Sequence, residues 1–143
     1  MAQVGIRGPY QESSYAVCVQ SSAYDPVDGE TRYIGQIAYG PTVTAGIRKI
    51  YIRAVGIIKR VEIFCWASTA AGTNEDWSLY VRVNGATDYL IATVSLAAAT
   101  RVFSNSFMNV PLVNGDYFEI KIVQPVWVTN PTGVFYAGYV YIE

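Results

Sequence analysis

The sequence contains no histidine among its 143 residues. Histidine is the commonest general base and a member of the Ser-His-Asp and Cys-His catalytic arrangements, so these sites are excluded, as are histidine-ligated metal centres. A phosphate-binding loop is also missing, because Gly5-Ile6-Arg7-Gly8 is not followed by a Gly-Lys-Ser pattern. We therefore predict a protein that is not an enzyme and that needs no cofactor or metal.

Carboxylates remain as candidates for chemistry, and several of them lie in two turn-like segments: Asp25, Asp28, Glu30, Glu75 and Asp76. Paired carboxylates hydrolyse glycosides, and a loop rich in oxygen ligands binds Ca²⁺. The first segment lacks the Asp-x-Asp-x-Asp-Gly spacing of a calcium loop. Acids in turns usually hydrogen-bond nearby backbone or face water, and we favour that interpretation for both segments.

Charged residues make up only 15% of the chain, and the net charge is −1. No run of basic residues provides the concentrated positive surface that a nucleic-acid-binding protein needs, so no nucleic acid is expected as a partner. The apolar runs stop well short of the ~20 residues that span a bilayer, which argues against membrane insertion. The first seven residues lack the apolar core of a signal peptide, and we expect a cytosolic start.

Only two cysteines are present, Cys18 and Cys65, and each lies in an apolar, strand-like context. A free buried cysteine behaves as a small hydrophobic residue. Nothing in the sequence indicates secretion, so free buried thiols are favoured over the alternative of a disulfide.

Short runs rich in strand-forming residues, separated by turns, fill the chain from residue 15 onward. They cover residues 15–19, 32–39, 47–54, 59–67, 77–83, 88–96, 101–103, 107–112, 117–123 and 134–142. Asn84-Gly85 is a strong hairpin signal, and a second turn lies at residues 114–116. No convincing helix is present. The pattern predicts an all-β fold: an antiparallel, two-sheet, jelly-roll-like sandwich as a single domain over residues 15–143, preceded by an extended N-terminal arm over residues 1–14.

The last predicted strand is apolar on both faces. One face holds Val134, Tyr136, Gly138, Val140 and Ile142, and the other holds Phe135, Ala137, Tyr139 and Tyr141. A strand of this kind needs cover on both sides. Either it lies inside its own domain, or its second face meets another subunit. Because the chain is 52% apolar and poor in charge, we expect self-association, with Phe135, Tyr139 and Tyr141 in the contact.

Aromatic residues are abundant, with 12 Tyr, 5 Phe and 3 Trp. They are enriched at protein interfaces, they stack on sugar rings, and they also fill β-sheet cores. We assign Trp66 and Trp77 to the core. Trp127 lies in a segment bracketed by Pro125 and Pro131, so we expect it to be exposed and available for outward contact.

Three motifs in the C-terminal half resemble those of C1q/TNF-like jelly rolls. Residues 79–85 (LYVRVNG) resemble a strand followed by Asn-Gly, residues 113–120 (VNGDYFEI) resemble the penultimate Gly-Asp strand, and residues 135–142 (FYAGYVYI) resemble the closing strand. The resemblance covers roughly residues 57–143, and residues 1–50 match no known pattern. It implies a compact homotrimer of a kind that recurs in bacteriophage head fibres, capsid decoration proteins and tail-fibre tips.

The resemblance therefore implies a virion structural protein, made in the host cytoplasm and located on the capsid surface. A short arm without a long stalk favours a decoration (cement) subunit that contacts the major capsid protein or another virion protein. We expect the arm, with Ile6, Pro9 and Tyr10, to dock on the particle. The alternative is a receptor- or carbohydrate-binding module of a fibre or tail tip, with a host-surface glycan as its ligand.

Overall fold

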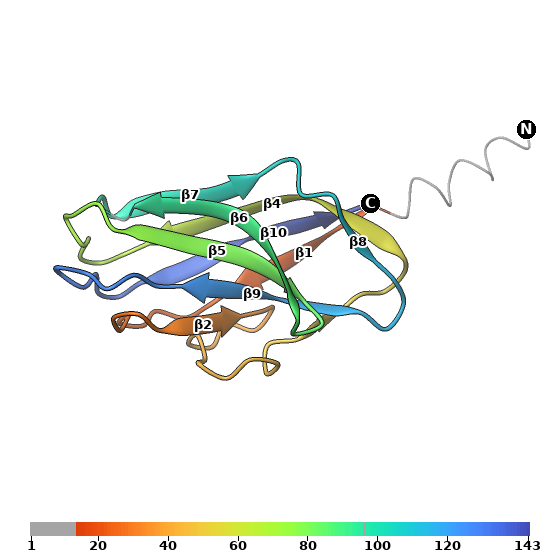
Figure 1. The fold of residues 1–143 in the computed structure, drawn as a ribbon, viewed down its shortest axis with the longest axis horizontal. Helices are drawn as coiled ribbons and strands as arrows, with labels where there is room; N and C mark the ends of the chain where they lie inside the picture. The colour runs from red at the N-terminus through yellow and green to blue at the C-terminus, as the bar shows by residue number, and fades with distance from the viewer. Residues whose placement is uncertain (1–13, 96) are drawn as a thin grey trace, which may run out of the picture.

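A computed structural model describes residues 14–95 and 97–143 of the chain. These residues form ten strands, and no helix occurs among them (Figure 1). The strands are β1 (Tyr15–Gln20), β2 (Thr31–Ile34), β3 (Ile50–Tyr51), β4 (Gly56–Trp66), β5 (Asp76–Val83), β6 (Thr87–Ser95), β7 (Thr100–Asn105), β8 (Val110–Leu112), β9 (Tyr117–Val123) and β10 (Phe135–Ile142).

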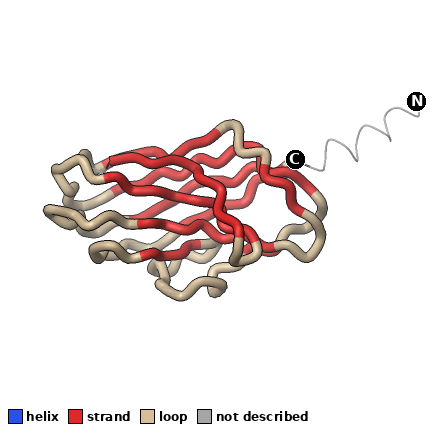
Figure 2. Tube along the Cα trace, in the orientation of Figure 1, coloured by secondary structure: helices blue, strands red, loops and turns tan. Residues whose placement is uncertain are grey.

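The strands form two antiparallel sheets that pack face to face (Figure 2). One sheet has the order β1-β10-β4-β7 with β8 added beside β4, and the other has the order β2-β9-β5-β6 with β3 added beside β9. Most successive long strands thus cross between the sheets in the order of a jelly roll, whereas β5 and β6 form a hairpin within one sheet. The predicted all-β, two-sheet antiparallel sandwich is confirmed.

Alternation of side chains along the strands builds the core between the sheets. Along β4 the side chains of Val61, Ile63 and Cys65 are fully buried. At the centre, the Trp77 ring on β5 makes edge contacts with the rings of Phe103, Trp127 and Tyr136, at centroid distances of 6.0, 5.5 and 5.7 Å. Edge-to-face geometry of this kind stabilises aromatic pairs beyond the apolar area that they bury. Trp77 is therefore a core residue, as predicted.

Two turns at one end of the sandwich are joined by a single side chain. Asn84 and Gly85 have positive φ values of 52° and 66°, which the tight β5–β6 hairpin requires. The Asn84 side chain donates to the Asp116 carboxylate (2.8 Å) and accepts from the backbone N–H of Tyr117 (3.1 Å). The predicted Asn-Gly hairpin is thus confirmed, and its first residue also fixes the turn before β9.

The strands predicted at residues 32–39 and 47–54 are much shorter than expected. β2 ends at Ile34 and β3 has two residues, and the segment between them folds over the edge of its sheet as a loop. Tyr33 exchanges two backbone hydrogen bonds with Thr42, and the Arg48 guanidinium donates to the Gly40 carbonyl (3.0 Å). These local bonds satisfy the backbone in place of a longer strand ladder.

β10 lies between β1 and β4 and approaches both closely. Tyr15 at the start of β1 is in register with Ile142 at the end of β10, and Gly138 at its middle lies opposite Ile63 of β4. A Cβ atom added at Gly138 would overlap the Glu62 carbonyl oxygen and lie 2.6 Å from the Ile63 Cα. Only glycine therefore allows this approach of the two backbones.

We predict that Gly138→Ala lowers the free energy of unfolding by about 1–3 kcal/mol or more, because the added methyl group must push β10 away from β4. Urea denaturation of the two proteins measures the difference. Gly40→Ala is the control, since a Cβ there meets only the Ser22 hydroxyl at 3.8 Å. Equal stability of Gly138→Ala and the wild type would contradict the close approach.

Candidate functional site

The outer surface of the β1-β10-β4-β7 sheet is rich in aromatic and apolar side chains, and we call it the aromatic face. Side-chain alternation and strand register place fourteen residues on it. They are Ala16, Cys18, Gln20, Arg60, Glu62, Phe64, Trp66, Thr100, Val102, Ser104, Phe135, Ala137, Tyr139 and Tyr141.

The aromatic side chains of this face form two groups across β4 and β10. In the first, the Phe135 ring lies 5.4 Å from Trp66 and 6.2 Å from Phe64, centroid to centroid. In the second, the Tyr139 and Tyr141 rings are 6.2 Å apart. The Arg60 guanidinium stacks over Tyr141, 4.1 Å from the ring centroid. These contacts hold the rings in place while leaving much of their surface open to solvent.

The burial of β10 decides whether both of its faces are covered within the domain or one face is open. Its inward residues Tyr136, Val140 and Ile142 are buried in the core, whereas Tyr139 is 49% exposed and Ala137 is exposed as well. The alternative of a strand covered on both sides within one domain is therefore wrong for the described part of the chain. The structure brings Phe135, Tyr139 and Tyr141 onto one face, as the sequence predicts.

Three sequence-based assignments are wrong. Trp66 is not a core residue, because it follows buried Cys65 and so points outward beside Phe135. Cys18 is exposed rather than buried, since it alternates with the buried Val17 and Val19. The other expectations for the cysteines agree with the structure: Cys65 is buried, and both thiols are free. Trp127 is only 5% exposed, because its ring packs against Trp77, and its neighbours Val126 and Val128 face solvent instead.

The turn carboxylates are engaged in holding loops together. Asp25 accepts a hydrogen bond from the backbone N–H of Gly133 (2.8 Å), and Asp28 accepts one from Trp127 (3.1 Å). Glu75 accepts from the N–H of Val128 (3.0 Å) and from the Thr73 hydroxyl, and these bonds lower its pKa. Asp76 is exposed at the start of β5, and Glu30 pairs with Arg32. Asp25, Asp28 and Glu75 thus accept from the backbone of the distant 124–134 loop, whereas the sequence predicts bonds to nearby backbone or exposure to water.

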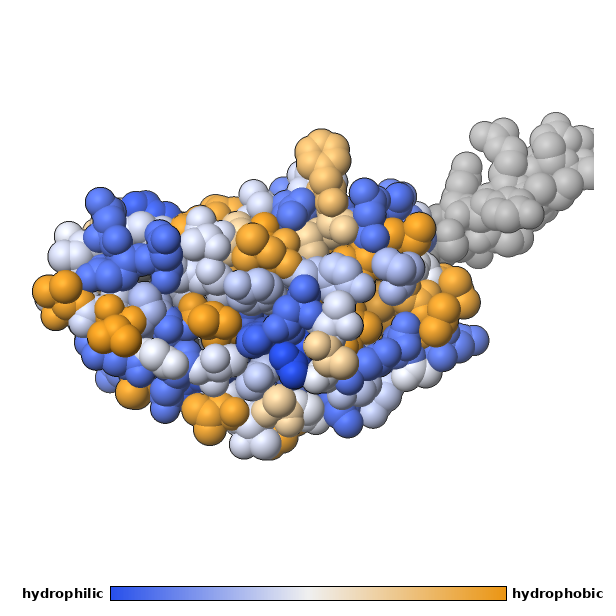
Figure 3. All heavy atoms as spheres, in the orientation of Figure 1, coloured by the Kyte–Doolittle hydropathy of each residue, from blue (hydrophilic) through white to orange (hydrophobic). Residues whose placement is uncertain are grey.

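On the outer surface of the other sheet, which we call the polar sheet, charged side chains pair with one another. Asp88 lies between two cations, 3.0 Å from the Arg82 guanidinium and 2.5 Å from the Lys121 ammonium group. Lys121 also lies over the Tyr80 ring. On the side of the molecule where this sheet lies, hydrophilic side chains are interspersed with hydrophobic ones (Figure 3). The charged groups of this surface therefore pair with one another, whereas the aromatic face carries five clustered aromatic rings.

Glu119 on β9 is a buried carboxylate that the sequence did not single out. It lies beneath the 35–49 loop, and both of its oxygens accept from the Gly46 N–H, at 2.9 and 3.2 Å. Desolvation raises the pKa of Glu119, and the Gly46 bond and the charges of Arg82 and Lys49 oppose this shift only in part. Glu119 is buried because the 35–49 loop covers it, and no local sequence motif indicates this.

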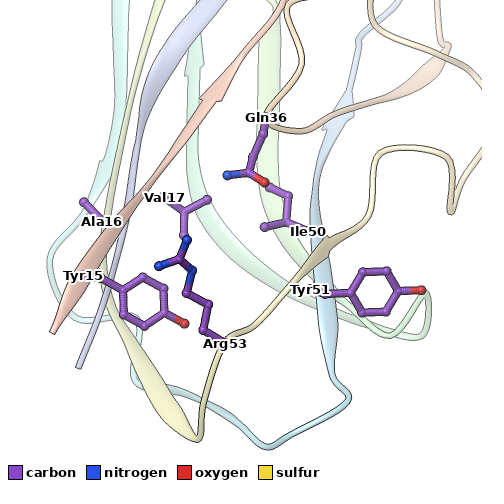
Figure 4. Close-up of a pocket in the computed structure, with 7 residues that line it drawn as sticks. All are labelled: Tyr15, Ala16, Val17, Gln36, Ile50, Tyr51 and Arg53. Atoms are coloured by element: carbon purple, nitrogen blue, oxygen red, sulfur yellow. The ribbon is translucent and has the colours of Figure 1, made fainter. Parts of the chain in front are cut away.

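A groove of about 260 Å³ opens beside the edge strand β1 (Figure 4). Its walls are formed by Tyr15, Ala16, Val17, Gln36, Ile50, Tyr51 and Arg53. A second hollow of about 410 Å³ borders the aromatic face, lined by Lys59, Arg60, Ser106, Tyr141 and Glu143. In residues 14–95 and 97–143, no group of three or more His, Cys, Asp or Glu residues is placed to hold a metal ion, and no helix is long and apolar enough to cross a membrane.

Comparison with known proteins finds no matching family model and no matching curated sequence. The arm residues Ile6, Pro9 and Tyr10 lie outside the described residues. The aromatic face, an outer surface with partly exposed aromatic rings, is the candidate site for an interaction.

Glu119 makes the stability of the protein depend on pH. Because its folded-state pKa is raised above the ordinary value of 4.5, its contribution to stability is present at low pH and is lost as pH rises through the folded pKa. Glu119→Gln keeps the shape and a hydrogen-bond acceptor but does not titrate. We predict that the variant gains stability relative to the wild type as the pH rises from about 4.5, the ordinary pKa, into the neutral range. Urea denaturation across this range measures the difference; a constant difference would contradict the prediction.

Proposed function

We propose that the chain is a structural subunit of a virus particle, a capsid decoration (cement) protein that assembles as a homotrimer through its aromatic face. The observation that carries the proposal is an outer sheet surface on which Phe64, Trp66, Phe135, Tyr139 and Tyr141 gather while remaining partly exposed. Large exposed apolar patches on a folded protein mark interaction surfaces.

The energetics of the two outer surfaces support contact through one of them. Burying a fully exposed large apolar side chain stabilises by roughly 1.5–3 kcal/mol, so covering several partly exposed rings offsets part of the entropy lost in association. The rings are already packed against one another, which reduces the cost of ordering them in a complex. The opposite surface has its charges Arg82, Asp88 and Lys121 paired with one another and gains little from being covered.

The assignment to a virus particle is supported by the jelly-roll strand order together with the three strand motifs that resemble C1q/TNF-like domains. Those motifs fall on β5 and its hairpin, on β9 and on β10, the strands that carry the centre of both sheets. The partners on this proposal are other copies of the chain and the major capsid protein or another virion protein. The N-terminal arm remains the proposed particle-docking element.

The second candidate function is that of a receptor- or carbohydrate-binding module. Trp66 and Phe135, with ring centroids 5.4 Å apart at one end of the aromatic face, offer a surface on which sugar rings stack. Binding of the wild type to a glycan array, lost in Trp66→Ala while the oligomer is retained, would favour this function over the structural one.

Tyr139→Asp tests the assembly face. We predict that the wild type is a trimer and that the variant is a monomer of 15.7 kDa, because an unpaired charge would be buried in the contact. Light scattering after size-exclusion chromatography measures the mass. Leu90→Asp is the matched control, since Leu90 is 47% exposed on the other sheet, close to the 49% of Tyr139. A wild type that is monomeric at all concentrations would refute the proposal.

Cys18 provides a natural reporter for the same face. Its exposed thiol lies on β1 in register with Tyr139, so assembly through this face shields it from a thiol reagent. We predict labelling at least about tenfold slower in the wild type than in the Tyr139→Asp variant, because a thiol must be reached by its reagent. Burial raises the pKa of Cys65 to about 12, so Cys65 does not contribute to the signal. Equal rates in the two proteins would place the contact elsewhere.

The particle itself tests the biological assignment. We predict that the protein purifies on icosahedral particles from infected cells in a fixed ratio to the major capsid protein, and that washing at high salt leaves it attached because apolar contacts are not screened. Quantitative mass spectrometry of gradient-purified particles measures the ratio. Recovery only in fractions free of particles would refute the virion assignment and leave the self-assembly result standing.

A further inference from the structure

The aromatic face carries two charged side chains among its fourteen residues, Arg60 and Glu62. Both belong to β4, point outward and are exposed, and they stand two residues apart, about 7 Å along an extended strand. Within the described residues, neither takes part in an ion pair closer than 4.0 Å. The polar sheet differs, because Arg82, Asp88 and Lys121 are all paired there.

The surroundings of the two side chains explain why they do not pair within one chain. The Arg60 guanidinium leans across to β10 and stacks on the Tyr141 ring, 4.1 Å from its centroid. Glu62 lies one register step further along, between Tyr139 on β10 and Ser104 on β7. Stacking thus places the guanidinium over β10, and no ion pair with Glu62 forms within 4.0 Å in the described residues.

Assembly through the aromatic face changes the energetics of both groups. A charge covered by an apolar partner surface loses its hydration, and a buried charge without a partner destabilises the complex by several kcal/mol. Arg60 and Glu62 must therefore each find an opposite charge when the face is covered. Neighbouring copies of the same face supply an acid for Arg60 and a base for Glu62, so both charges can be matched.

We propose that Glu62 of one copy accepts hydrogen bonds from the Arg60 guanidinium of the adjacent copy, and that this pair makes the contact specific for another copy of the same chain. The inference rests on the proposed assembly through the aromatic face. In a closed ring of three, each copy gives Arg60 to one neighbour and Glu62 to the other, so every charge is satisfied. The hollow of about 410 Å³ beside Arg60 leaves room for an incoming carboxylate, with Lys59 and Glu143 on its walls.

Charge reversal in the full-length chain tests the pair. Arg60→Glu places two acids across the contact, and Glu62→Arg places two bases there. We predict that each raises the dissociation constant of the oligomer by at least about tenfold, since like charges in an interface repel. The double variant Arg60→Glu/Glu62→Arg exchanges the charges and restores opposite pairs. We expect its dissociation constant to return to within about fivefold of the wild type, the remainder being the lost stacking on Tyr141.

Two further reversals control for net charge. Arg53→Glu alters the groove beside β1, and Asp76→Arg alters the start of β5 on the other sheet, and both should assemble as the wild type does. Light scattering across a dilution series gives the dissociation constants, and thermal melting confirms that every variant is folded.

The outcomes separate this inference from the proposal on which it rests. Rescue in the double variant supports the Arg60–Glu62 contact between copies. A double variant as dissociated as the two single variants overturns it, while a trimeric wild type and a monomeric Tyr139→Asp variant still uphold the aromatic face. Unchanged assembly in both single reversals also overturns it, because the two charges then lie outside the contact. A monomeric wild type overturns both.

Discussion

The pairing of β10 with β1 on one side and β4 on the other is the constraint on which the rest of the structure depends. It joins the earliest described strand, a middle strand and the last strand in one sheet, and its register decides which side chains face the core. Gly138 allows the backbones to meet at the centre of this arrangement. Once the register is set, Tyr136, Val140 and Ile142 are buried, and Phe135, Tyr139 and Tyr141 must face outward. The aromatic face is therefore a direct consequence of how the core is built.

The distribution of charge differs between the outer surfaces of the two sheets, and this difference distinguishes the aromatic face. The chain has few charged residues, and three of them form ion pairs with one another on the outer surface of the polar sheet. The aromatic face keeps one acid and one base, set apart by the stacking of Arg60 on Tyr141. On the proposed assembly, neighbouring copies cover the partly exposed rings and supply opposite charges for Arg60 and Glu62. The small number of charged residues thus bears both on how the charges pair in the fold and on the proposed assembly.

The sequence was most informative where structure is local. The strand-forming runs at residues 59–67, 77–83 and 117–123 and the Asn84-Gly85 signal predicted β4, β5, β9 and the hairpin, because strand propensity and turn conformation depend on neighbouring residues. Trp66 could also have been placed correctly, since its position after Cys65 puts it on the outward side. Its size suggested the core instead, although bulk does not determine which way a strand residue points.

Other features depend on partners far along the chain. Trp127 is buried because Trp77 and Asp28 bind its ring and its backbone N–H, and the prolines around it give no hint of either. Phe64 and Trp66 meet Phe135 only through the register of β4 with β10, which short-range patterns do not fix. Glu119 is covered by a loop whose path depends on its own hydrogen bonds. These contacts are properties of the three-dimensional arrangement.

The position of β10 also sets an order of events during synthesis. Until the ribosome has released this strand, β1 and β4 lack the partner that lies between them, and the sheet cannot close. Pairings between residues so distant in sequence form late and slowly. Three of the five aromatic side chains of the aromatic face, Phe135, Tyr139 and Tyr141, arrive with the same strand. On the proposed assembly, copies can recognise one another through this face only after β10 has been synthesised and has paired with β1 and β4.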